Sequence, residues 1–317
     1  MRNIRNTNVC VIGGCGFLGS HLVNHLIIDR HCTVLVLDNL IAGKLEFLNP
    51  KAIFEWCDIT HSESELRKFF EKYKIEYVFN YAASPYIPVS FERPIHVFDI
   101  NAVGALKVMN AAQDAGVKAV LQVSSAEIYG DAPKHKIDEK YPANPHSTYG
   151  SAKLAIDNLV TCRWKEAGTP VIALRQFNCV GENETHPYVI PEIIGQLSKS
   201  NTVWLGNNSF RDFQYAGDAV RMAVELLEKG NFGEVYNMGS EDGIQIYDLA
   251  ELIGHLMGHK EVIIELDHSK IRPYEIWWLQ SDNTKLYSVI DYRPKTTLEE
   301  SLKLVIIDYK KNGFSYE

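Results

Sequence analysis

The sequence predicts an α/β protein with a doubly wound parallel sheet of the Rossmann type and a smaller C-terminal α/β lobe. Short β-branched runs bounded by glycine alternate with helical segments through the first half of the chain. The first strand-to-helix turn is rich in glycine, and the second strand ends at an acidic residue. From about residue 178 the alternation loosens. We therefore expect a dinucleotide-binding domain over residues 1–178, with returning segments near 214–240, and a mainly substrate-binding lobe over 179–317.

Length, charge and composition describe an ordinary globular protein. The chain has 317 residues, is 46% hydrophobic and carries a formal net charge of −8, so neither nucleic acid nor a membrane is expected as a partner. The six cysteines form no C-x-x-C pair and the eleven histidines form no ligand pattern, which predicts reduced thiols and no metal site. The sequence shows no signal peptide and no run of eighteen apolar residues, so we expect a cytoplasmic protein.

The first strand–helix–strand unit predicts dinucleotide binding. A strand over 8–12 leads through a G-x-x-G-x-x-G turn into a helix over 17–28, and a second strand over 33–37 ends at Asp38. Glycines let such a turn approach a pyrophosphate, which the helix N-terminus attracts. The Asp38 carboxylate can accept hydrogen bonds from the adenosine ribose and would repel a 2′-phosphate, which favours NAD over NADP. The three glycines are Gly13, Gly16 and Gly19.

The same alternation predicts the remaining elements. One strand carries particular weight, because it delivers Ser124 and Ser125 to the carboxyl edge of the sheet, where ligands of such folds bind. In the first domain, strands are expected over 54–57, 77–79, 119–123 and 171–174, and helices over 63–74, 99–115 and 148–167. Beyond it, helices are expected over 191–199, 217–228, 246–257 and 297–310, and strands over 203–205, 235–238 and 261–266.

Tyr149 and Lys153 lie one turn apart on the helix expected over 148–167 and therefore share a face. A free phenol has a pKa near 10 and is a poor base at neutral pH. A lysine ammonium within a few ångströms favours the phenolate and can bring this pKa toward the working pH. Lowering it by three units requires about 4 kcal/mol of differential stabilisation. Ser125 is expected to hold the same substrate oxygen that Tyr149 deprotonates.

Taken together, the motifs resemble an extended short-chain dehydrogenase/reductase of the nucleotide-sugar epimerase/dehydratase family. The resemblance covers nearly the whole chain, and chance occurrence of the full series is negligible. The series comprises the glycine turn with Asp38, Asp58-Ile59, Tyr81-Ala82-Ala83, Asn101 before Gly104, Ser124-Ser125-x-Glu127-x-Tyr129-Gly130, Tyr149-x-x-x-Lys153, Phe177-Asn178-x-x-Gly181, Arg211-Asp212-Phe213-x-Tyr215-x-x-Asp218 and Arg272-Pro273.

The resemblance implies catalytic, cofactor and substrate sites. It makes Tyr149 the catalytic base, which Lys153 tunes while holding the nicotinamide ribose, and lets Ser125 orient the sugar hydroxyl. Trp204 would pack against the nucleotide base; the alternative is that it is a residue of the hydrophobic core. The resemblance also implies a homodimer joined by helices near 101–116 and 149–167. Residues implied for NAD are Gly13, Gly16, Phe17, Leu18, Gly19, Asp38, Asn39, Asp58, Ile59, Tyr81, Ala82, Ala83, Asn101, Ser124, Tyr149, Lys153 and Phe177. Those implied for a nucleotide-diphosphate sugar are Ser84, Ser125, Asn178, Val189, Trp204, Arg211 and Arg272.

Glu127 is the position that separates the reactions of the family. All members would first remove the sugar 4-hydroxyl proton and the C4 hydride, which gives a 4-keto hexose. A 4-epimerase then only rotates the sugar, whereas in 4,6-dehydratases a glutamate matching Glu127 takes the C5 proton and water leaves C6. Nucleotide-sugar decarboxylases carry a glutamate there too, and a purely structural carboxylate is another alternative. Ala126 departs from the dehydratase pattern, because it cannot protonate the leaving hydroxyl, so Glu127 or water would have to do so.

We favour an NDP-sugar 4,6-dehydratase, with a UDP-glucose-type 4-epimerase as the main alternative and a decarboxylase after it. A non-catalytic NAD-binding protein would have the same fold, but such proteins often lose the tyrosine or the lysine that this chain retains. A ketoreductase that uses NADPH is disfavoured by Asp38.

Overall fold

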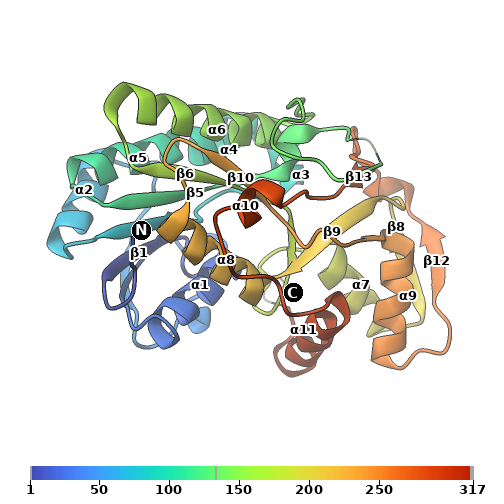
Figure 1. Cartoon of the computed structure of the whole chain (residues 1–317). Helices are drawn as coiled ribbons and strands as arrows, with labels where there is room; N and C mark the ends of the chain where they lie inside the picture. Colours follow the sequence, from blue (N-terminus) through green and yellow to red (C-terminus); the bar gives the residue numbers. More distant parts are fainter. Residues whose placement is uncertain (1, 133, 315–317) are drawn as a thin grey trace.

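Seven parallel strands form the central sheet of the computed structural model, which describes residues 2–132 and 134–314 (Figure 1). The strand order is β10-β6-β5-β4-β1-β2-β3. The chain passes from β1 to β2 and β3 on one side and returns to β4 on the other, so a crevice forms at the carboxyl ends of β1 and β4. The expected doubly wound α/β fold is confirmed. The strands are β1 (Asn8–Ile12), β2 (Thr33–Asp38), β3 (Ile53–Trp56), β4 (Tyr77–Asn80), β5 (Ala119–Ser125), β6 (Val171–Gln176) and β10 (Val235–Met238).

Each face of this sheet has its own hydrophobic core, because successive strand residues point to opposite faces. Val9 and Val11 of β1 pack with the buried residues of α1 and α8. Cys10 and Ile12 pack with those of α2, α5 and α6. Two helical layers therefore enclose the sheet (Figure 1). Their bounds are α1 (Phe17–Ile28), α2 (Glu63–Lys72), α5 (Ala105–Asp114), α6 (Thr148–Ala167) and α8 (Ala216–Lys229).

The helix expected over 99–115 begins earlier and is not regular. It starts as α4 (Pro94–Phe98), widens into the π-helical turn η2 (Asp99–Gly104) and continues as α5. A Cβ atom on Gly104 would lie 2.8 Å from the Ile59 side chain, so the end of the wide turn packs tightly against that residue. Asn101, within the turn, is only 1% exposed. The turn therefore directs Asn101 into the protein interior.

A second, smaller α/β unit carries most of the C-terminal half. Its larger sheet has the order β11-β9-β13, with β7 also paired to β9, and β8 pairs with β12 separately. Helices α7, α9 and α11 contribute to a third hydrophobic core. The bounds are β7 (Asn178–Val180), β8 (Thr202–Leu205), β9 (Phe210–Tyr215), β11 (Gly243–Gln245), β12 (Ile263–Leu266), β13 (Trp278–Leu279), α7 (Val189–Leu197), α9 (Ile246–Met257) and α11 (Leu298–Asn312).

Strand β9 has no counterpart among the strands expected from the sequence. Its buried residues include Arg211, Asp212 and Gln214, so its sequence lacks the apolar pattern from which a buried strand is predicted. The remaining elements are short: α3 (Ile87–Glu92), α10 (Thr284–Tyr287), η1 (Leu45–Phe47), η3 (Ala126–Tyr129) and η4 (His268–Lys270). Within residues 2–132 and 134–314, no helix has the length and apolar character needed to cross a membrane.

Candidate active site

A cavity of about 1260 Å³ runs along the carboxyl edge of the central sheet and continues against the C-terminal lobe. It brings most of the residues expected for cofactor and substrate into one space. Expected cofactor residues in its wall are Gly13, Gly16, Phe17, Leu18, Gly19, Asp38, Asn39, Asp58, Ile59, Tyr81, Ala82, Ala83, Ser124, Tyr149, Lys153 and Phe177. Expected substrate or catalytic residues there are Ser84, Ser125, Glu127, Asn178, Val189, Arg211 and Arg272.

The glycine turn after β1 has the shape of a pyrophosphate site. Gly13 has a φ of +79°, and a Cβ on Gly19 would lie 2.0 Å from the Gly13 carbonyl oxygen. Neither position can therefore carry a side chain without moving the turn. A Cβ on Gly16 would meet only that same oxygen, at 3.4 Å, so the backbone beside Gly16 faces open space. Gly16 caps α1 without a side-chain hydrogen bond, which leaves the first N–H groups of α1 available to an anion.

Two carboxylates stand at the ends of β2 and β3, on the side of the cavity expected for adenosine. Asp38 accepts hydrogen bonds from the Cys15 N–H (3.0 Å) and the Leu40 N–H (2.8 Å). Burial raises the pKa of Asp38, which these backbone donors oppose. Asp58 accepts from the Asn39 amide at 3.0 Å. The backbone donors fix the Asp38 carboxylate at the cavity wall, where it can accept hydrogen bonds from a ribose.

Tyr149, Lys153 and Ser125 are buried together where α6 crosses β5. Burial raises the pKa of Tyr149, a hydrogen bond with Ser125 opposes this, and the nearby Glu127 raises it further. The Lys153 ammonium donates to the Val123 carbonyl oxygen at 3.1 Å and lies 5.7 Å from the centroid of the Tyr149 ring. Burial also lowers the pKa of Lys153 to about 8. The expected lowering of the Tyr149 pKa by Lys153 is thus not seen in the chain by itself, because the ammonium is directed to a carbonyl and burial disfavours its charge.

Glu127 lies in the cavity among groups of both charges. Burial raises the pKa of this carboxyl, while Arg211 and Arg272 oppose the rise. Arg211 forms an ion pair with Glu275 at 2.9 Å, and both side chains are 9% exposed. Glu275 also accepts a hydrogen bond from the Asn207 amide at 2.8 Å. A diphosphate at Arg211 would therefore have to share this guanidinium with Glu275.

Three buried polar atoms in the cavity wall lack hydrogen-bond partners among the described residues. They are the Tyr81 hydroxyl, the Gln176 side-chain oxygen and the Asn178 side-chain oxygen. Buried polar groups normally have partners, because an unsatisfied one costs about 1–3 kcal/mol. The cavity wall therefore contains three polar atoms whose hydrogen bonds no described residue satisfies.

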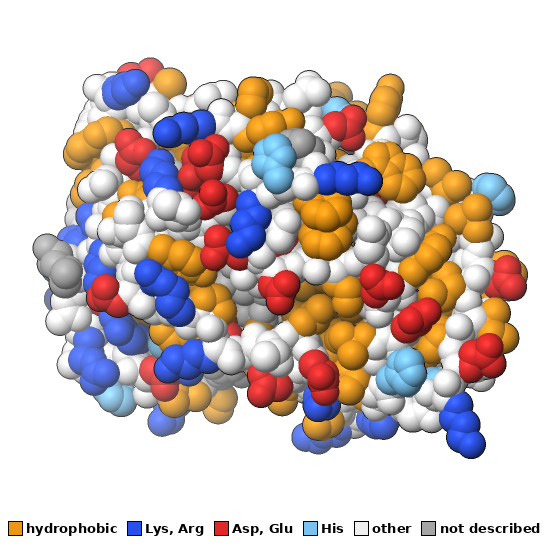
Figure 2. Space-filling model, turned by 45° about the vertical axis from the view of Figure 1, so that its right-hand side comes forward, with side chains coloured by type: hydrophobic (Ala, Val, Ile, Leu, Met, Phe, Trp, Pro, Cys, Tyr) orange, Lys and Arg blue, Asp and Glu red, His pale blue; other side chains and the backbone are white. Residues whose placement is uncertain are grey.

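Two residues assigned to ligands do not line the cavity. Asn101 bonds to Ser84 instead: its side-chain oxygen accepts from the Ser84 N–H at 2.9 Å, and its amide donates to the Ser84 carbonyl at 3.1 Å. Both polar groups of its side chain therefore support the loop after β4. Trp204 is 49% exposed on β8, in neither the core nor the cavity. Figure 2, in which this lobe comes forward, shows hydrophobic side chains at its surface.

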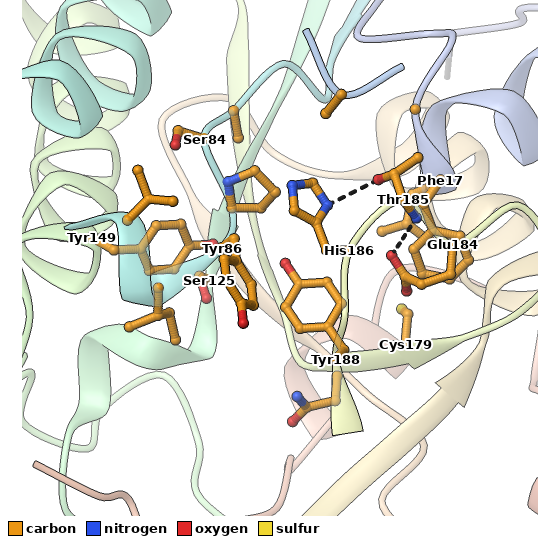
Figure 3. A pocket seen from close by; sticks show the side chains of 18 of the residues that line it. Phe17, Ser84, Tyr86, Ser125, Tyr149, Cys179, Glu184, Thr185, His186 and Tyr188 are labelled. Atoms are coloured by element: carbon orange, nitrogen blue, oxygen red, sulfur yellow. Dashed lines mark hydrogen bonds between the residues drawn. The ribbon is translucent and has the colours of Figure 1, made fainter. Parts of the chain in front are cut away.

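The structure adds cavity residues that the motifs did not identify. Tyr86, Glu184, His186 and Tyr188 lie together, with Tyr149 on one side of the view in Figure 3 and Glu184 on the other. Burial raises the pKa of Glu184 to about 8. Three of the four residues belong to the loop between β7 and α7. The run Glu184-Thr185-His186-Pro187-Tyr188 could have indicated a binding loop from the sequence, since it combines polar and aromatic residues.

Comparisons with known proteins agree with this geometry. The model of the NAD dependent epimerase/dehydratase family matches residues 9–239. The chain is 30% identical to the dTDP-D-glucose 4,6-dehydratase of Mus musculus, over 98% of this chain and 90% of that protein. Among solved structures it is similar to the UDP-glucose 4-epimerase of Thermotoga maritima with UDP-glucose (TM-score 0.88, 30% identity, 96% and 99% coverage). It is also similar to the UDP-glucose 4-epimerase of Thermus thermophilus in complex with NAD (TM-score 0.86, 25% identity, 96% and 99% coverage). The chain belongs to the NAD dependent epimerase/dehydratase family.

Proposed function

We propose that this protein is an NAD-dependent enzyme that modifies a nucleotide-diphosphate hexose through a 4-keto intermediate, and that its reaction is a 4,6-dehydration. The observation that carries the proposal is the meeting of Tyr149, Ser125 and Glu127 in one cavity with the glycine turn. A buried site with several shifted pKa values is typical of acid–base chemistry.

Each residue of the site would have a separate role in this reaction. Bound NAD would supply the redox chemistry, by taking a hydride from the sugar and returning it. Tyr149 would hold the proton of the sugar 4-hydroxyl, with Ser125 bonded to the same oxygen. The resulting C4 ketone acidifies the C5 hydrogen. The Glu127 carboxylate would take the C5 proton, and Glu127 or a water molecule would protonate the C6 hydroxyl as the C6–O bond breaks, so that water leaves and a C5–C6 double bond forms. The glycine turn, Asp38 and Lys153 would hold the cofactor.

The environment of Glu127 supports dehydration. Burial raises the pKa of its carboxyl, and a carboxylate of higher pKa is a stronger base toward a C–H bond. A 4-epimerase remains the second candidate, because Ala126 is a buried methyl group, 1% exposed, that cannot donate a proton to a leaving hydroxyl.

Incubation with UDP-, GDP-, dTDP- and CDP-hexoses, followed by mass spectrometry, tests the proposal. Dehydration gives a product lighter by one water, epimerisation gives a stereoisomer of the same mass, and decarboxylation of a uronic acid gives loss of carbon dioxide. Glu127→Gln should abolish release of the dehydrated product while a transient NADH absorbance persists. Normal turnover by Glu127→Gln would contradict the dehydratase assignment.

We also propose that two copies associate through the helical layer formed by α4, η2, α5 and α6. Three apolar side chains are exposed along its first two elements: Ile95 is 83% exposed, Phe98 40% and Val103 38%. Exposed apolar side chains gathered along one segment are typical of protein–protein contacts.

A further inference from the structure

Three aromatic side chains form a cluster in the cavity: Tyr86, His186 and Tyr188 (Figure 3). The rings of Tyr86 and His186 are stacked, with centroids 5.8 Å apart. His186 and Tyr188 have centroids 5.7 Å apart, and Tyr86 and Tyr188 meet edge to face at 5.8 Å. Tyr86 precedes α3, whereas the other two come from the loop before α7. The cluster thus joins two distant segments of the chain at one wall of the cavity.

The cluster lines the same cavity as Tyr149 and Arg272. The charges of Tyr149 and Arg272 both influence the pKa of Tyr188, and that of Arg272 also influences the pKa of Tyr86. In the proposed function, Tyr149 acts at C4 of the hexose, and the family resemblance implies that Arg272 binds the diphosphate attached to C1. Because the hexose must span these two points, its ring would lie against the cluster.

His186 is held in one orientation within this cluster. Its Nδ1 and the Thr185 hydroxyl are 2.9 Å apart, and its carbonyl accepts from the Tyr188 N–H at 2.8 Å. Burial lowers the pKa of His186, so at neutral pH the imidazole carries one N–H and one lone pair. When Thr185 donates to Nδ1, the proton is on Nε2, which is then available as a donor.

We propose that His186 binds the hexose directly, with Nε2–H donating to a sugar hydroxyl while Tyr86 and Tyr188 pack against the ring. Neutral imidazole and phenol groups provide no ion-pair partner for a sugar carboxylate, and Arg272 is assigned to the diphosphate, so the cluster suits a neutral hexose rather than a sugar acid. The inference rests on the proposed function, and it makes His186 a determinant of which hexose is accepted.

Titration calorimetry of the full chain with UDP, UDP-glucose, dTDP and dTDP-glucose tests the inference. His186→Ala should weaken binding of the glucose-bearing ligand about three- to tenfold, the loss of one net hydrogen bond, and leave binding of the matching nucleoside diphosphate unchanged. His186→Gln should retain most of the affinity, because its amide can donate in place of Nε2. His135→Ala, which removes an exposed histidine outside the cavity, is the matched control, and thermal unfolding checks that every variant is folded.

An equal loss for both members of a pair, or no loss for either, would overturn the hexose contact. The proposed function would then still stand, provided that the wild-type chain binds a nucleotide sugar. If the wild-type chain binds none of the four ligands and turns over no nucleotide sugar, the proposed function fails and this inference fails with it.

Discussion

At the scale of single residues, burial determines where protons are held in the cavity. It raises the pKa of Tyr149, Glu127 and Glu184 and lowers that of Lys153, because a charge is poorly solvated in a site closed to water. All four shifts favour the neutral form. The shifts thus favour a proton on Tyr149, Glu127 and Glu184 and favour its loss from Lys153, and such shifted groups are typical of sites of acid–base chemistry.

Tyr149→Phe tests the role of the phenol. The change removes the hydroxyl but keeps the aromatic ring and its packing. We therefore expect turnover to fall by about 10²- to 10⁴-fold, the usual contribution of a general acid–base group. Binding of the nucleotide sugar, measured by calorimetry, should change little. Tyr141→Phe, whose hydroxyl bonds to the Asp131 carbonyl outside the cavity, is the control. Retained turnover in Tyr149→Phe would remove the assigned role.

The raised pKa of Glu184 predicts that the free energy of unfolding depends on pH. Its pKa is raised from 4.5 to about 8, so the folded chain binds this proton more tightly than the unfolded chain does. The stability gained is fully present below pH 4.5 and is lost as the pH rises through 8. We expect Glu184→Gln to lose less free energy of unfolding than the wild type between pH 5 and pH 8. The difference should be a few kcal/mol, and at most about 4 kcal/mol, because one proton over three pH units changes the free energy by no more than that.

Urea unfolding at the two pH values measures this difference. Glu251→Gln, at an exposed position of α9, should lose as much stability as the wild type. Parallel curves for the wild type and Glu184→Gln would show that Glu184 titrates normally.

Motif residues at strand ends could be placed from the sequence, because the sheet fixes them. Gly13, Asp38 and Ser125 each follow or end a parallel strand, and parallel strands bring their carboxyl ends to one edge. Tyr86 and His186 could not be placed in this way, since their contact depends on how two separate loops fold over the sheet.

At the scale of elements, strand β9 connects the parts of the C-terminal lobe through a buried carboxylate. Asp212 is fully buried, and it accepts from the Ser240 N–H at 2.6 Å and from the Ser281 N–H at 2.9 Å. Both serine hydroxyls and the Glu241 N–H also donate to it. A sequence pattern of alternating hydrophobicity does not reveal such a strand, because three of its buried residues, Arg211, Asp212 and Gln214, are polar. The helices and strands that could be predicted have apolar faces instead.

Asp212→Ala tests this arrangement. It leaves several buried donors without an acceptor, each at a cost of about 1–3 kcal/mol, so we expect a loss of at least about 3 kcal/mol of unfolding free energy. Asp242→Ala removes an exposed carboxyl from the loop that carries Ser240 and Glu241, and it should cost less than about 0.5 kcal/mol. Thermal unfolding compares the two variants, and equal melting temperatures would contradict the structural role of Asp212.

At the scale of the whole molecule, the cavity depends on both parts of the chain. The N-terminal half contributes the glycine turn, Asp38 and Ser125 from the ends of sheet strands and Tyr149 from α6, and the C-terminal half contributes Arg211, among others. Strand β10 comes from the C-terminal half, yet it pairs with β6 at the edge of the central sheet. The two parts thus share a sheet as well as a site, which fixes the position of one relative to the other.

The proposed association of two copies predicts that a charge at Ile95 would separate them. A carboxylate at this position would have to be buried in the contact between the copies, which costs far more than leaving it in water. We therefore expect Ile95→Asp to sediment as a monomer at a concentration at which the wild type sediments as a dimer. Ile307→Asp introduces the same charge at a side chain that is 63% exposed on α11, outside the proposed contact, and it should remain dimeric. A dimeric Ile95→Asp would place the contact elsewhere, and a monomeric wild type would exclude it, since the apolar side chains of α4 and η2 would then lie in water in the native protein.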